Sequence, residues 1–77
     1  MTWELARAIA QHLSTWGFEI EQIYEILIHV QTQTSLRELA AYLMTCIETG
    51  RHPTAEEVYE VALRIEAMNR QDELPDV

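Results

Sequence analysis

The sequence contains no lysine, and its five arginines are set against 13 acidic residues, which leaves a net charge of −8. Affinity for nucleic acids depends largely on cationic side chains that neutralise phosphates, and anionic membranes repel an acidic chain for the same reason. The charge balance therefore argues against nucleic acids and membranes as binding partners. It is compatible with a basic protein partner.

Cysteine and glycine are nearly as scarce as lysine. Cys46 is the only cysteine, so no disulfide can form within the chain, and a lone cysteine is typical of a reducing compartment. It lies in an apolar stretch, where a thiol is buried and unreactive. Gly17 and Gly50 are the only glycines, which leaves no glycine-rich loop to hold phosphates. We therefore expect no enzymatic activity.

Long apolar runs are also missing. No stretch reaches the roughly 18 uncharged apolar residues of a membrane-spanning helix. Residues 1–4 carry no positive charge of the kind found at the start of a secretory signal. With the lone cysteine, these absences predict a cytoplasmic protein.

What the sequence does contain is a strong helical pattern. Apolar residues recur every three or four positions in four segments bounded by helix start and stop signals. This pattern predicts an all-α bundle of four short helices, about residues 3–16, 19–31, 36–49 and 54–69, with the third helix at the centre. Residues 1–70 would form a single domain, and the acidic residues 71–77 a disordered, flexible tail.

Several local signals set the expected helix ends. Ser35 with Glu38, and Thr54 with Glu57, have the spacing of a capping box, in which each side chain binds the other residue's amide. Gly17 and Gly50 are placed as left-handed helix terminators.

The second segment has an alternative interpretation. From residue 24 to residue 34, β-branched and aromatic residues alternate strictly, as in a strand. A strand requires a partner, and the chain offers no second candidate, so it would have to pair across a dimer. A helix is favoured, and the intersubunit strand remains open.

Residues 39–47 contain no charge, so this helix is apolar on nearly all sides. Such a helix lies at the centre of a bundle or in a subunit interface. Because 48% of the residues are hydrophobic in so small a domain, we expect a homodimer or an obligate protein partner. The candidate interface comprises Tyr24, Leu27, Ile28, Leu39, Tyr42, Leu43, Met44 and Ile47.

Glu21, Glu25 and His29 are spaced four apart along the second helix. Glu21 and His29 would lie about 12 Å apart along the helix axis, too far to share a metal ion. The Glu-x-x-His spacing of helical di-metal sites is absent. We therefore expect a solvated helix face, with no metal and no cofactor.

Residues 48–59 resemble the helix–helix junction in the winged-helix domain of ferric uptake regulators, over about a sixth of the chain. Neither the β-wing nor the histidine-rich metal sites of that family follow within these 77 residues. The resemblance therefore implies a capped helix junction and no activity.

These features predict a non-enzymatic interaction module, a small acidic regulator or adaptor that docks through an apolar helix face rimmed with carboxylates. The alternative is an acidic inhibitor, of the kind phages carry, whose carboxylates imitate nucleic-acid phosphates and block a basic protein. Docking requires acids dispersed around an apolar patch, whereas mimicry requires a contiguous acidic stripe. The glutamate–arginine pairs of the last segment, Glu60 with Arg64 and Glu66 with Arg70, favour docking.

Overall fold

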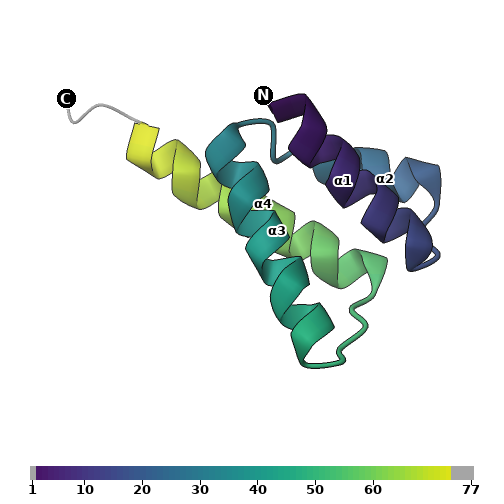
Figure 1. Ribbon diagram of the computed structural model, residues 1–77. Helices are drawn as coiled ribbons and strands as arrows, with labels where there is room; N and C mark the ends of the chain where they lie inside the picture. The colour runs from purple at the N-terminus through teal and green to yellow at the C-terminus, as the bar shows by residue number, and fades with distance from the viewer. Residues whose placement is uncertain (1, 74–77) are drawn as a thin grey trace.

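The computed structural model describes the backbone of residues 2–73 and the side chains of residues 4–69. Its helices are α1 (Thr2–Thr15), α2 (Ile20–Leu27), α3 (Gln33–Glu48) and α4 (Ala55–Glu73), shown in Figure 1. The predicted all-α bundle of four helices is thus confirmed. Within this range, no helix combines the length and the apolar character needed to cross a membrane.

The helices form a ring in which each one packs against two others. α1 contacts α2 and α3, and α4 contacts the same two helices. Within the described range α1 does not contact α4, and α2 does not contact α3. Figure 1 shows α1 and α2 side by side, with α3 crossing α4. The prediction that the third helix is central is therefore wrong. Its uncharged stretch buries one side only and leaves Met44 and Ile47 exposed.

The core fills the middle of this ring. Leu13, Leu39 and Val58, from three different helices, are completely shielded from solvent. All four helices and the α2–α3 connection contribute to the core, which comprises Ile9, Leu13, Ile23, Ile26, Val30, Leu36, Leu39, Leu43, Val58, Ala62 and Ile65. Each helix therefore turns one apolar face inward, as its periodicity predicts.

Both glycines end helices as predicted. Gly17 adopts a φ of +91°, and the amide of Phe18 beyond it donates to the Leu13 carbonyl at 3.1 Å. Gly50, with a φ of +70°, ends α3 with the same pattern of bonds. Side chains other than glycine's are strained at such φ values, so these two turns depend on glycine.

Of the two predicted capping boxes, one is confirmed and the other is wrong. The Glu57 amide donates to Thr54 Oγ1 at 3.2 Å, and the Thr54 amide donates to Glu57 Oε1 at 2.9 Å. α3, in contrast, begins one turn earlier than predicted, with Thr32 as its cap accepting from the Ser35 amide at 3.1 Å. Thr32 is an equally good capping residue. Because Thr32 caps the helix, Ser35 lies in its first turn and is buried.

α2 is shorter than predicted. It ends at Leu27, and residues 28–32 form the connection to α3. The Gln31 side chain donates to the Ile28 carbonyl at 3.0 Å and satisfies an acceptor at the helix end. The strand interpretation is wrong, since residues 24–34 contain no strand.

α4 extends beyond its predicted end at residue 69. Residues 71–73, which were predicted to belong to the disordered tail, continue the helix because no proline or glycine interrupts it there. The remainder of the predicted tail, residues 74–77, lies outside the described residues.

The burial of α3 predicts that an aspartate unfolds the protein at one position of the helix and is tolerated two residues away. Leu43→Asp places a carboxylate where only 3% of the side chain is exposed, and we expect it to lower the free energy of unfolding by more than about 4 kcal/mol. Ala41→Asp, at an exposed position of the same helix, should remain folded. Thermal unfolding followed by circular dichroism measures both. A folded Leu43→Asp variant would contradict the core as described.

The capping box at the start of α4 predicts a pH dependence. The hydrogen bond from the Thr54 backbone, followed by that from Arg51 at 2.9 Å, lowers the pKa of Glu57 below its ordinary 4.5. A carboxyl with a lowered pKa in the folded state adds stability above its unfolded pKa, and this stability is lost as the pH falls through the folded pKa.

Denaturant unfolding of Glu57→Gln should therefore depend less steeply on pH than the unfolding of the wild type between about pH 5 and pH 3. Glu56→Gln removes the same charge one residue away and should retain the wild-type slope. If the free energy of unfolding of Glu57→Gln falls with pH as steeply as that of the wild type, Glu57 is not a source of the pH dependence.

Candidate interaction surfaces

α2 carries apolar side chains on its outer side as well as on its inner side. Ile23 and Ile26 face the core, whereas Ile20, Tyr24 and Ile28, which we call the α2 stripe, are 82%, 69% and 39% exposed. Their spacing of four residues places them along one side of the helix.

Two carboxylates accompany the α2 stripe. Glu21 and Glu25 line the same shallow hollow as its three apolar side chains. α2 contains no basic residue. The surface therefore combines exposed apolar area with two carboxylates that no basic residue of α2 accompanies.

A second apolar surface lies between α1 and α3, and we call it the α1–α3 groove. It encloses about 280 Å³, and Met44 and Ile47 on its α3 side are 55% and 46% exposed. None of the described side chains that line it is acidic, lysine or arginine. They are Leu5, Ala8, Ile9, His12, Ala40, Leu43, Met44 and Ile47.

The predicted interface residues do not form a single surface. Tyr24 and Ile28 belong to the α2 stripe, and Met44 and Ile47 to the α1–α3 groove. Of the remaining four, Leu39 is buried in the core, Leu43 is buried there and also lines the groove, and Leu27 and Tyr42 are half-buried. Leu39 and Leu43 expose at most 3% of their area, because the period of α3 directs them inward.

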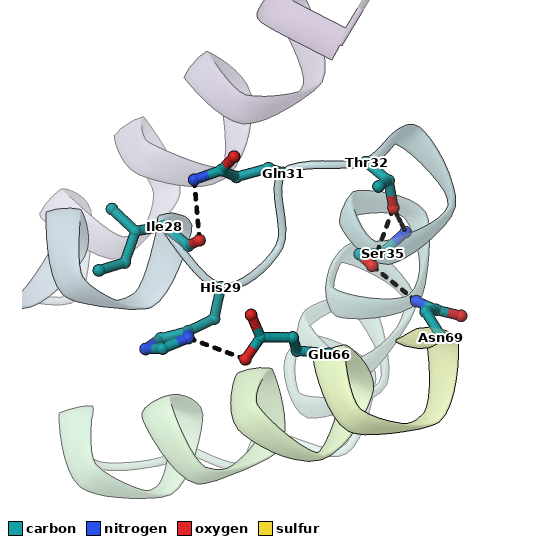
Figure 2. Close-up of a pocket in the computed structure, with 7 residues that line it drawn as sticks. All are labelled: Ile28, His29, Gln31, Thr32, Ser35, Glu66 and Asn69. Carbon is teal, nitrogen blue, oxygen red and sulfur yellow. Dashed lines mark hydrogen bonds and ion pairs between the residues drawn. The ribbon is translucent and has the colours of Figure 1, made fainter. Parts of the chain in front are cut away.

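A polar cleft of about 250 Å³ lies where the α2–α3 connection meets α4 (Figure 2). His29 Nδ1 lies 3.0 Å from Glu66 Oε1, and Asn69 Nδ2 donates to Ser35 Oγ at 2.6 Å. Asn69 Nδ2 also donates to Glu38 Oε1 at 3.0 Å. Sequence reasoning missed this cleft, because no local pattern connects residues more than 30 positions apart.

Ser35, His29 and Glu66 are residue types that form hydrolytic triads, but the cleft does not arrange them as one. Ser35 Oγ is bonded to Thr32 and Asn69. Figure 2 shows His29 directed at Glu66 through Nδ1, with its other ring nitrogen pointing away from Ser35. A nucleophilic serine needs a base within hydrogen-bonding reach. The contacts instead tie the α2–α3 connection and the start of α3 to α4.

Glu21, Glu25 and His29 are not stacked on one helix. α2 ends before His29, which turns to Glu66. Glu25 lines a hollow between α2 and α4 together with Glu56, besides the hollow of the α2 stripe that it lines with Glu21. Among the side chains that the structure describes, no three potential metal ligands come together.

The aromatic residues near the end of α1 pack against one another. The Trp16 ring lies 4.6 Å from that of His12 and 5.0 Å from that of His52, between centroids, and Phe18 packs nearby. This cluster joins α1 to the α3–α4 connection. His12 Nε2 is shielded from solvent and has no hydrogen-bond partner within the described part of the chain.

Cys46 is buried, as expected for an inert thiol, with 3% of the residue exposed. Partial burial, followed by a hydrogen bond to Cys46, raises the pKa of the neighbouring Tyr42 phenol. Cys46 is therefore not presented to solvent as a reactive thiol, whereas Tyr42 is half-buried.

Comparison with protein-family models, curated proteins and solved structures gave no match. The function is therefore argued from the geometry of these surfaces alone.

The polar cleft predicts a stability difference between two serines. Ser35→Ala removes the hydroxyl that Thr32 and Asn69 contact at a buried position, and we expect a loss of about 1–3 kcal/mol. Ser14→Ala, at an exposed position of α1, should change stability by less than about 0.5 kcal/mol. Urea unfolding compares the two variants. Equal effects would mean that the cleft contributes nothing to folding.

Proposed function

We propose that this protein is a non-enzymatic interaction module that binds a basic amphipathic segment of a partner protein along the α2 stripe. The observation that carries the proposal is the combination of Ile20 and Tyr24, at 82% and 69% exposure, with Glu21 and Glu25 in one hollow. In this role the chain is a small acidic regulator or adaptor.

The apolar part of the stripe would supply affinity. Complete burial of an isoleucine side chain contributes about 1.5–3 kcal/mol, and Ile20 is almost entirely exposed in the free chain. Tyrosine is enriched among the residues that dominate binding energy. A partner helix with apolar residues at helical spacing would cover the stripe along its length.

The carboxylates determine which partner fits. Lysine or arginine beside the partner's apolar residues would meet Glu21 and Glu25, which speeds association and disfavours acidic competitors. A second copy of this chain is a poor occupant. Two α2 helices would bring glutamates together with no basic residue on either helix to compensate.

The acidic inhibitor that imitates nucleic acid is the second candidate. Glu25 of α2 and Glu56 of α4 line one hollow, so carboxylates from two helices do converge. Such an inhibitor would depend on these charges and not on Ile20 or Tyr24.

The α2 stripe predicts binding of a synthetic amphipathic helix built from leucine and lysine. The double substitution Ile20→Ser with Tyr24→Ser should weaken this binding about tenfold or more, which corresponds to about 1.4 kcal/mol. Both side chains are exposed, so the fold should be retained. Fluorescence anisotropy of the labelled peptide measures the dissociation constant.

Met68→Ser serves as the matched control, because Met68 is 54% exposed on α4 and does not line the hollow of the α2 stripe. A peptide of the same composition, shuffled so that it has no apolar face, should bind more weakly. Two results together would overturn docking in favour of charge mimicry. The first is a double variant that binds the peptide as tightly as the wild type does. The second is binding that is lost in a Glu25→Gln, Glu56→Gln variant and that weakens steeply as the salt concentration rises.

A further inference from the structure

The α1–α3 groove differs in charge from the other hollows described above. The polar cleft contains Glu66, the α2 stripe is flanked by Glu21 and Glu25, and the α2–α4 hollow contains Glu25 and Glu56. Among the described side chains that line the α1–α3 groove there is no carboxylate, lysine or arginine. Such a surface stands out on a chain whose net charge is −8.

This difference favours a different occupant. A basic partner would find no carboxylate in the groove to pair with. Two copies of the chain repel each other through their net charge and come together most readily where each surface is uncharged. Small-molecule sites usually enclose about 300–1,000 Å³. The groove encloses about 280 Å³, just below that range, and is better suited to receive side chains of another protein chain.

The shape of the groove is self-complementary along α3. Ile47 projects at one end and Met44 near the middle, whereas the small side chain of Ala40 lies at the other end, with Ala8 of α1 also lining the groove. Ala40 and Ile47 are separated by about 10 Å along the helix axis. A two-fold axis midway between them, near Met44, places Ile47 of each copy over Ala40 of the other. Such a reciprocal contact is characteristic of a two-fold symmetric interface.

We infer that the α1–α3 groove is a self-association surface, in which two copies pack their α3 helices antiparallel around Met44. This inference is independent of the proposed binding at α2, because the two surfaces share no residue. A dimer formed in this way leaves the α2 stripe of each copy free.

Sedimentation velocity over a concentration series tests the inference. The wild type should reach twice the 9.0 kDa mass of the chain. Ile47→Glu places a charge at the rim of the groove, where Ile47 is 46% exposed, and should remain a monomer at every concentration tested. Met68→Glu adds the same charge to α4 and should dimerise like the wild type. Circular dichroism verifies that each variant is folded.

A cross-linking experiment tests the register directly. Met44→Cys should form an intersubunit disulfide on mild oxidation, since the two-fold axis brings the two copies of residue 44 together. Cys46 is buried and should not compete, and Met68→Cys should not cross-link at the same rate.

Three results would overturn the inference. The first is a wild type that stays monomeric throughout the series. The second is a dimer that Ile47→Glu does not disrupt. The third is a dimer that Ile20→Glu disrupts instead, which would place the contact on α2.

Discussion

The structure depends on the shared burial of one apolar face from each helix at the centre of a ring. Over the described residues each helix contacts two others, so none is enclosed there, and each has an outer side that remains on the surface. Leu13, Ile26 and Leu39 show how completely the inner faces are used, since each is at most 1% exposed. A domain of this size cannot also cover its outer faces. The chemistry of those outer faces therefore decides what the chain can bind.

The two apolar outer faces carry different charge. On α2 the exposed apolar residues lie beside glutamates, while along α1 and α3 they lie among alanines and other uncharged residues. We propose the first surface for a basic partner and the second for another copy of the chain. The polar cleft in Figure 2 has a different role, because its hydrogen bonds hold the start of α3 and the α2–α3 connection on α4. These contacts stabilise the ring on which both surfaces depend.

Local signals in the sequence predicted most of the architecture. Gly17, Gly50 and the Thr54 capping box act within a few residues of themselves, so the pattern alone located these helix ends. The start of α3 was misplaced because Thr32 and Ser35 are both good caps, and only the core decides which one turns inward. The end of α2 was misplaced for a similar reason, because it depends on contacts that residues 28–32 make on folding.

The candidate site was predictable only in part. The uncharged stretch of α3 and the apolar residues of α2 correctly identified helices with more apolar surface than the core uses. The uncharged stretch of α3 did not by itself show which of its predicted interface residues stay exposed. Leu39 and Leu43 are buried, whereas Met44 and Ile47 are exposed. His29 and Glu66 are separated by 37 positions, and nothing in the sequence alone pairs them.

The central claim is that a basic partner contacts the apolar side of α2 together with its carboxylates. Backbone amide NMR during titration with the leucine–lysine helix tests this most directly, because each amide reports on its own surroundings. The account predicts that the largest chemical-shift changes fall on residues 20–28. Changes concentrated on the α1–α3 groove, or spread evenly over the glutamates of α2, α3 and α4, would contradict it.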